Sequence, residues 1–378
     1  MSAAGSIDIV LSGKGRGVDI ISGRRALPDA LTHGRAPAEV SALLPRLFAV
    51  CALAQGAAAA EACENALGVP AAAALVAKRA FLVKAEAARE HLLRLLVETP
   101  KSLGVPASPE DLAALRGLAG ALRRAVEERP LPQWQVEKRA IRAHVTDLVT
   151  RHLYVPAAAD EPARFLNWLE GNDRPLARFC QHLLDHDAAT LGAEGKPSRN
   201  VADLAVDEIG ARLLGPDGDS FSTRPGVDGG QPETTSFIRL QDAPLVAGLK
   251  ARFGDGLLTR IVARQLEVVT LVTDMARLDP ACDLGSAPFR LADAPSGTGE
   301  GFAAVETARG RLIHAVRLRD GNIADYRILA PTDWNFHPEG PVMRRLDRLS
   351  NGAPATESRA RMLIDAFDPC APYRLMVQ

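Results

Sequence analysis

The sequence has few aromatic residues, little net charge and no long apolar run. Aromatic residues make up only 4% of the 378 residues, so the core must be built mainly from aliphatic side chains. The formal net charge of -1 gives no electrostatic case for nucleic acid or an anionic membrane as a partner. The N-terminal run IDIVL is too short for the apolar part of a signal peptide, and no stretch suits a membrane span. These features predict an ordinary soluble protein.

Cysteines are also few, and their positions exclude two common roles. The five are odd in number and widely scattered, at Cys51, Cys63, Cys180, Cys282 and Cys370. No CxxC pair occurs, so neither a disulfide framework nor a zinc knuckle is indicated. The cysteine pattern therefore predicts a reducing, cytoplasmic location. Cys63 and Cys282 belong to no motif and are predicted to be chemically inert.

Most of the chain shows helical periodicity. The segment SIDIVLSGKGRGVDIIS predicts an N-terminal hairpin in which GKGRG is the turn. Ser108 is a plausible N-cap for a helix that ends by Pro130, and a long helix before it is expected to stop at Pro100. The other predicted helices span residues 37–68, 135–153, 161–169 and 177–191, with one or two more across 243–278.

The spacing changes toward the C-terminus. Residues 215–232 are rich in Gly, Pro and Asp and predict a long loop or a boundary between helical layers. In RLIHAVRLRDGNIADYRILAP, two alternating runs flank Asp320-Gly321-Asn322, which predicts a tight hairpin. A helix across 356–367 then leads into Asp368-Pro369-Cys370, where the proline predicts a stiff turn with Asp368 extended. The expected class is α+β, predominantly helical, with β-hairpins near both termini.

Several stretches resemble the large subunit of nickel–iron hydrogenases. They are RLFAVCALAQGAAAAEACENALG, PETTSFIRL, ETARGRLIH, ILAPTDWNFHPEGP and AFDPCAPY. These pieces run from near the N-terminal hairpin to the end of the chain. The resemblance therefore implies the large-subunit fold as a single domain over residues 1–378.

The cysteine motifs of that family are only half present. In the hydrogenases, R-x-C-G-x-C-x-x-x-H and D-P-C-x-x-C-x-x-H supply four thiolates to nickel, and the second cysteine of each motif also bridges to iron. This chain keeps Cys51 and Cys370, whereas Phe48 and Tyr373 replace the other two thiols. The remaining departures are at the glycine and histidine positions, Ala49, Gln55 and Met376. Because nickel held by sulfur needs several soft ligands, the resemblance predicts no hydrogenase-type cluster and no hydrogen turnover.

Residues on the iron side of the family's site are kept. The resemblance places Arg309 and Thr332 where the hydrogenases donate hydrogen bonds to iron-bound cyanide, and Asp368 where an acidic residue lies near that arginine. A guanidinium is a rigid, permanently charged donor that suits an anionic acceptor.

This half-site is similar to that of the HupK/HoxV group of hydrogenase accessory proteins. The resemblance implies a non-catalytic scaffold that holds an iron fragment with cyanide and carbon monoxide ligands transiently, through Cys51 and Cys370, before transfer to the large subunit. The implied partners are hydrogenase maturation proteins and the large-subunit precursor. Two other hypotheses remain: an enzyme with a divergent mononuclear iron site, and a metal-free structural subunit.

Alternatives also remain for single residues. Cys370 matches the family's nickel-only position and Tyr373 the iron-bridging one, so the cysteine pair could bind iron in a shifted geometry, Cys51 could act alone, or both could be relic core thiols. Arg309 could donate to cyanide, pair with Asp368, or do both. The Thr332 hydroxyl could instead cap its own turn.

Other chemistry-bearing residues favour structural roles. His182 and His186 have helical spacing with Cys180 close by, but no further ligand follows, so an exposed helix face is predicted rather than a metal site. Trp334 and Phe336 are expected to be core aromatics.

Overall fold

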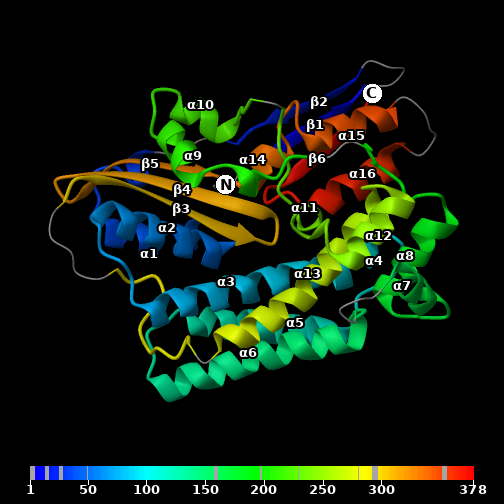
Figure 1. Cartoon of the computed structure of the whole chain (residues 1–378), viewed down its shortest axis with the longest axis horizontal. Coiled ribbons are helices and arrows are strands. Elements are labelled where there is room, and N and C mark those ends of the chain that lie inside the picture. Colours follow the sequence, from blue (N-terminus) through cyan, green and yellow to red (C-terminus); the bar gives the residue numbers. More distant parts are fainter. Residues whose placement is uncertain are drawn as a thin grey trace.

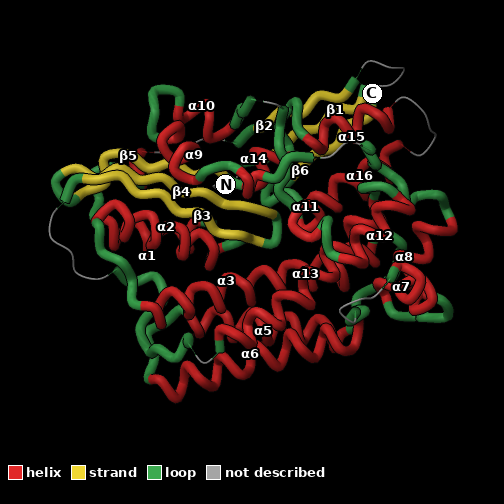
Figure 2. The backbone as a smooth tube through the Cα atoms, in the orientation of Figure 1, coloured by secondary structure: helices red, strands yellow, loops and turns green. Residues whose placement is uncertain are grey.

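The computed structural model describes residues 5–12, 17–24, 29–48, 50–156, 161–195, 198–228, 230–279, 281–291, 297–350 and 356–378. Helices make up most of the fold, and two three-stranded sheets accompany them (Figures 1 and 2). The predicted α+β, predominantly helical class with hairpins near both termini is confirmed. The predicted turn GKGRG lies largely outside the described residues, as does Ala49.

Long helices form a layer along one side of the molecule (Figure 1). They are α3 (Ala73–Leu93), α5 (Pro109–Ala125), α6 (Leu131–His152) and α13 (Leu257–Leu278). Ser108 caps α5 as predicted, because its hydroxyl accepts a hydrogen bond from the backbone N of Asp111 at 3.0 Å. Aliphatic side chains fill the space between these helices, as the low aromatic content predicts.

The prediction that the long helix stops at Pro100 is confirmed to within one residue, because the helical run ends at Lys101. α3 continues into a π-helical turn, Arg94–Glu98, and then into the short α4, Thr99–Lys101. A proline ring clashes with the carbonyl one α-helical turn before it, and a wider π-turn relieves that clash. The continued helix places the Arg94 guanidinium against the carboxylate of Asp368.

A central antiparallel sheet lies above this layer. Its strands are β3 (Gly299–Thr307), β4 (Gly310–Arg319) and β5 (Asn322–Leu329), in that order. The predicted hairpin is β4–β5, and its positive φ angles are at Asp320 (52°) and Gly321 (79°) rather than at Asn322. Sequence analysis missed β3, which contains glycines. One of them, Gly301, lets α2 approach closely, because a Cβ there would lie 2.1 Å from the carbonyl oxygen of Ala62.

Helices cover both faces of this sheet. α1 (Pro37–Leu47) and α2 (Ala52–Leu67) lie on one face, and α9 (Val206–Leu213) and α10 (Gly218–Thr223) lie on the other (Figure 1). The predicted loop 215–232 is therefore partly wrong, since α10 lies within it. α10 is short and opens at Gly218, so neither its length nor its composition predicts a helix.

The second sheet joins the two ends of the chain. Its strands are β1 (Ile7–Leu11), β2 (Val18–Ser22) and β6 (Tyr373–Val377), in the order β2-β1-β6, with β6 parallel to β1. α14 (Pro331–Asn335), α15 (Pro341–Ser350) and α16 (Thr356–Phe367) precede β6. Pairing with β1 ties the tail down, so Cys370 occupies a fixed position.

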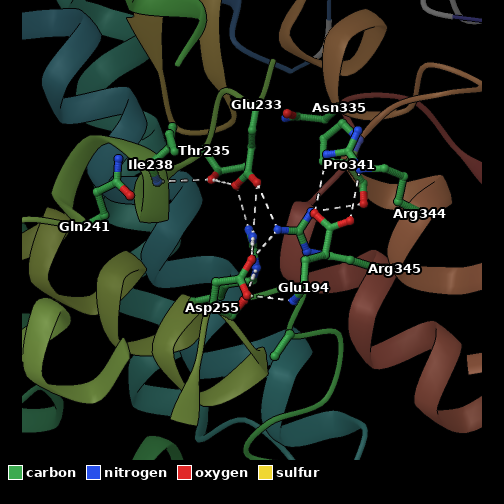
Figure 3. A network of polar contacts seen from close by, with 12 residues as sticks. Glu194, Glu233, Thr235, Ile238, Gln241, Asp255, Asn335, Pro341, Arg344 and Arg345 are labelled. Carbon is green, nitrogen blue, oxygen red and sulfur yellow. Dashed lines mark hydrogen bonds and ion pairs between the residues drawn. The ribbon is translucent and has the colours of Figure 1, made fainter. Parts of the chain in front are cut away.

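A buried ion-pair network fastens these C-terminal helices to the rest of the fold (Figure 3). It consists of Glu194, Glu233, Asp255, Arg260, Arg344 and Arg345. Arg345 of α15 is fully buried and meets Asp255 and Glu233, and Arg260 of α13 meets the same two carboxylates. The network links α15 to α13 through the carboxylates of Glu233 and Asp255.

The remaining elements are shorter. They are η1 (Asp29–Leu31), α7 (Pro162–Leu169), α8 (Pro175–Asp185), η3 (Val201–Asp203), α11 (Ser236–Leu240) and α12 (Pro244–Phe253). The helices predicted across 135–153, 161–169 and 177–191 correspond to α6, α7 and α8 with shifted ends. Among the helices described, none has both the length and the apolarity needed to cross a bilayer.

Candidate functional site

Cys51 begins α2 in an uncommon conformation. Its φ of 57° and ψ of 34° are left-handed, which a non-glycine residue rarely adopts. The residue is 8% exposed and packs among small and aliphatic side chains that include Ala54, Val83 and Leu312. Burial raises the pKa of the Cys51 thiol, and the nearby Arg309 opposes that shift.

Cys370 reaches the same cluster from the other end of the chain. It is partly buried and packs against the group that contains Cys51. Asp368 has φ 51°, so the prediction of an extended conformation is wrong. A left-handed residue terminates α16, and the charge contacts of the Asp368 carboxylate hold it there. The structure brings the two predicted cysteines together, while their role as metal ligands stays a prediction.

Two donors face the sulfur of Cys370. The Thr332 hydroxyl donates to Sγ at 2.9 Å and accepts from the Cys370 backbone N at 3.0 Å. Arg24 Nη1 also lies 3.4 Å from Sγ, and Arg24 Nε pairs with Asp333 at 2.6 Å. Sequence analysis missed Arg24, because no motif links it to residues at the far end of the chain. The Cys370 sulfur therefore accepts hydrogen bonds from two side chains, one on α14 and one near the N-terminus.

Arg309 connects Cys51 to two buried carboxylates. Its Nη1 lies 3.5 Å from Cys51 Sγ, and its Nη2 lies 3.2 Å from Glu90 and 3.4 Å from Asp368. The predicted pairing with Asp368 is therefore confirmed, and donation to cyanide stays a prediction. The Arg309 Nε is buried and has no hydrogen-bond partner in the part of the chain that the structure describes.

Asp368 is held as a carboxylate. Burial acts to raise its pKa, but Arg309, Arg94 and Arg264 together hold the pKa well below its usual range. Both ion pairs, to Arg94 and to Arg309, use Oδ1, whereas Oδ2 is buried without a partner among the described residues. Asp368 fixes Arg309 and still retains one open acceptor.

Glu86 on α3 supports the start of α2 next to Cys51. Its two oxygens accept from the backbone N atoms of Leu53 at 2.9 Å and Ala54 at 3.0 Å. Burial raises the pKa of Glu86 to about 7, and these two N–H groups oppose the shift. Sequence analysis missed Glu86, although a carboxylate on the mainly apolar segment AFLVKAEAAREHLL was a usable signal.

A buried polar chain lies on the other side of α2. His314 Nε2 is 3.0 Å from Gln55 Oε1, and His314 Nδ1 is 2.7 Å from the Tyr326 hydroxyl. Burial lowers the pKa of His314 to about 3, so the ring is neutral. Gln55, at the family's histidine position, therefore links α2 to the central sheet.

The replaced thiol positions are occupied by side chains with other contacts. Phe48 packs against a different core cluster, which contains Val40 and Leu44. The Tyr373 hydroxyl donates to Asp365 at 3.1 Å. Phe48 and the Tyr373 hydroxyl therefore contact other parts of the fold and do not take the place of the two missing thiols.

The remaining candidates are structural. Trp334 and Phe336 are buried core aromatics, as predicted. The rings of His182 and His186 stack 4.0 Å apart on a partly exposed face, whereas Cys180 is fully buried. Within the described residues, no group of three or more His, Cys, Asp or Glu side chains is arranged to hold a metal ion. A metal ion bound by Cys51 and Cys370 would therefore have few ligands from the described residues.

The chain resembles known proteins in sequence and in fold. Residues 245–371 match the family described as nickel-dependent hydrogenase. The chain is 32% identical to the hydrogenase expression/formation protein HupK of Bradyrhizobium diazoefficiens, over 91% of this chain and 88% of that protein. It is 31% identical to the hydrogenase expression/formation protein HoxV of Cupriavidus necator, over 93% of this chain and 91% of that protein. The fold matches the nickel–iron–selenium hydrogenase of Desulfovibrio vulgaris Hildenborough with a TM-score of 0.62 and 16% identity, over 94% of this chain and 93% of that one.

Proposed function

The chain belongs to the HupK/HoxV family of hydrogenase expression/formation proteins, relatives of the nickel–iron hydrogenase large subunit, and we propose that it is a non-catalytic scaffold for an iron fragment. The fragment carries cyanide and carbon monoxide ligands and is the cargo of the scaffold. Cys51 and Cys370 bind its iron, and the protein then passes it to the large-subunit precursor. The partners are other hydrogenase maturation proteins.

One observation carries the proposal. Two thiols from opposite ends of the chain meet in one cluster, and each has a hydrogen-bond donor within 3.5 Å. We refer to Cys51, Cys370, Arg309, Thr332 and Asp368 as the thiol cluster. Thiolates are good ligands for iron, and charged or hydroxyl donors suit the nitrogen of a bound cyanide. Asp368 orients Arg309 for this role.

The same cluster supports iron better than nickel. A nickel site of the hydrogenase type needs four soft thiolates, and two of those positions hold Phe48 and Tyr373. The side chains there are engaged with other parts of the fold. A scaffold with a half-site of this kind would retain the iron fragment without completing a catalytic centre.

Infrared spectroscopy and metal analysis test the proposal on protein purified without oxygen from cells that make the maturation machinery. We expect iron together with cyanide and carbonyl stretches. Iron without those bands would favour the mononuclear-iron enzyme, and no iron would favour the metal-free structural subunit.

Cysteine variants test the ligand assignment. Cys51→Ala and Cys370→Ala should each abolish iron retention, because thiolate ligation requires these groups. Cys63→Ala is the matched control, since Cys63 is also buried on α2 but lies in a different cluster, and it should keep its iron. Full iron occupancy in both test variants would remove the assignment.

A further inference from the structure

A wide pocket lies between the helices that cover the central sheet and the layer of long helices. It is bounded by α1 and α2 on one side, by α3 and α5 on the other, and by residues 287–291 (Figure 1). Its volume is about 730 Å³, which is within the range of pockets that bind ligands. We refer to this space as the interlayer pocket.

Two helices each leave one face open toward the interlayer pocket. On α1, Ala38, Ala42 and Arg46 recur at every fourth position, line the pocket and are exposed. On α5, Ala119 and Arg123 line the pocket with the same spacing. Residues four apart lie on one side of a helix, so each face presents alanine followed by arginine. Small side chains allow another helix to approach closely, and apolar positions of this spacing form grooves for amphipathic helices.

The lining of the pocket is mainly apolar, but its charged groups are unbalanced. Four arginines line the pocket, against one carboxyl group. Two of the four, Arg46 and Arg123, are exposed and have no hydrogen-bond or ion-pair partner within the described ranges of the chain. They lie in the last turns of α1 and α5. A cation in the last turn suits the helix dipole and remains available to an incoming carboxylate.

The other two arginines are paired, and one of them keeps an open donor. Arg290 lies 3.5 Å from Glu128, and both side chains are mostly exposed, so this pair is weak. Arg89 pairs with Glu90 through Nη1, whereas its Nε is buried without a partner among the described residues. The lining carboxyl group is Glu86, and its pKa of about 7 leaves it partly protonated at neutral pH. The pocket therefore keeps a positive charge after these three carboxyl groups are counted.

We propose that the interlayer pocket docks an acidic amphipathic helix of a partner protein. The apolar face of that helix packs against the alanines of α1 and α5, and its carboxylates meet the arginines. Charge complementarity favours this occupant over a basic or uncharged segment. A small anion would engage one or two arginines and leave the two open helix faces uncovered.

The pocket also adjoins the thiol cluster. Ala52 and Leu53 line it, and they directly follow Cys51 in the chain. Glu86 lines it too, and one of its oxygens accepts from the backbone N of Leu53. A docked helix would therefore lie against the segment that begins α2, beside Cys51. That the partner is a hydrogenase maturation protein rests on the proposed function, whereas the docking site itself requires no iron.

Photo-crosslinking of the full-length chain tests the docking site. The photoreactive residue benzoylphenylalanine replaces either Ala42, within the lining, or Glu39, an exposed neighbour on α1 that leaves the pocket open. The protein is made in cells that make the maturation machinery, and cross-linked peptides are identified by mass spectrometry. We expect a cross-link to an acidic amphipathic helix of a maturation protein, and none from Val136, an exposed position on α6 outside the lining. Cross-links only to a second copy of this chain or to a non-acidic segment, or none from either position, would overturn the proposal.

Charge reversal shows whether the arginines select the partner. The double variant Arg46→Glu with Arg123→Glu should lower the cross-linked fraction about tenfold, because carboxylates of the partner would then meet like charges. Arg116→Glu reverses an exposed arginine elsewhere on α5 and should leave the fraction unchanged. An equal fraction in both variants would refute the docking mode. Iron analysis of the same wild-type samples separates the two proposals: iron without a cross-link contradicts the docking site alone, and a cross-link without iron contradicts the iron scaffold alone.

Discussion

The ion-pair network and the thiol cluster use similar charged groups, but only in the ion-pair network does every carboxylate oxygen have a partner. The Arg345 Nε of that network is buried without a partner among the described residues. Both oxygens of Glu194, Glu233 and Asp255 accept hydrogen bonds or ion pairs from within the protein (Figure 3). In the thiol cluster, by contrast, Asp368 Oδ2 and Arg309 Nε are buried without partners among the described residues. Carboxylates that are paired on both oxygens stabilise one packing of the chain, whereas the open acceptor of Asp368 is suited to a bound ligand.

The pKa values of two buried glutamates, one in the ion-pair network and one beside the thiol cluster, shift in opposite directions. Burial acts to raise the pKa of Glu233, but Arg260 and Arg345 lower it to about 2, so the ionised form stabilises the fold. Glu86, next to Cys51, has only backbone N–H donors, and its pKa is raised to about 7. The arginine partners of Glu233 thus stabilise its ionised form, whereas Glu86 beside Cys51 has no such pairing and burial favours its protonated form.

The largest predicted effect is on the ion-pair network. Glu233→Gln removes the charge and leaves Arg260 and Arg345 undercompensated, so the free energy of unfolding should fall by about 3–5 kcal/mol. Denaturant unfolding of the metal-free protein measures this change. The exposed Glu357→Gln, which breaks the pair with Arg361, is the control and should change stability by about 0.5 kcal/mol or less. Equal effects of the two variants would show that the network is not what fastens α15.

The second prediction uses the opposite pKa shifts of the two glutamates. Because the folded pKa of Glu86 is above its usual 4.5, its protonated form stabilises the fold at low pH, and that contribution is lost as pH rises through about 7. Glu86→Gln should remove this loss, on the order of 3 kcal/mol, and flatten the curve of stability against pH between about 4.5 and 7. Glu233 should behave in the opposite sense, with its contribution present above 4.5 and lost as pH falls toward 2.

Unfolding curves at several pH values distinguish these cases. The wild type and Glu86→Gln should diverge in slope between pH 4.5 and 7, while the exposed Glu357→Gln should run parallel to the wild type. Parallel curves for Glu86→Gln would show that Glu86 remains ionised when buried.

The sequence predicted the parts of the molecule that depend on local pattern or on a motif. Helical periodicity located the long helices, and alternation located β4–β5. Cys51, Cys370, Arg309, Thr332 and Asp368 were found through motifs, and the structure brings all of them together.

Contacts between distant segments could not be predicted in this way. Arg24 and Asp333 are 309 positions apart, and nothing in either local sequence indicates the pair. The left-handed φ of Asp368 follows from its ion pairs, which outweigh the local preference of a residue before proline. Ion pairs between residues that are distant in sequence were therefore the main feature that the sequence did not predict.

A third prediction separates the two roles of Arg309. Arg309→Lys should lower the stability of the metal-free protein by about 1–2 kcal/mol, because a lysine cannot keep the bonds to Glu90, Asp368 and Cys51 at once. If Arg309 also donates to cyanide, the cyanide stretches of the loaded protein should shift as well. Unmoved bands with reduced stability would make Arg309 purely structural, and cargo recognition would then rest on Cys51 and Thr332.

The smallest predicted effect tests whether the thiol cluster needs Tyr373. Tyr373→Phe removes only the hydroxyl that donates to Asp365 at 3.1 Å, so stability should fall by about 0.5–1.5 kcal/mol. Iron retention should stay the same as in the wild type, because the phenol is engaged away from the sulfur atoms. The iron content of Tyr373→Phe is measured side by side with that of Cys370→Ala, which should lose its iron. If both variants lost iron equally, the phenol would be a ligand, and the open site would extend beyond the two thiols to β6.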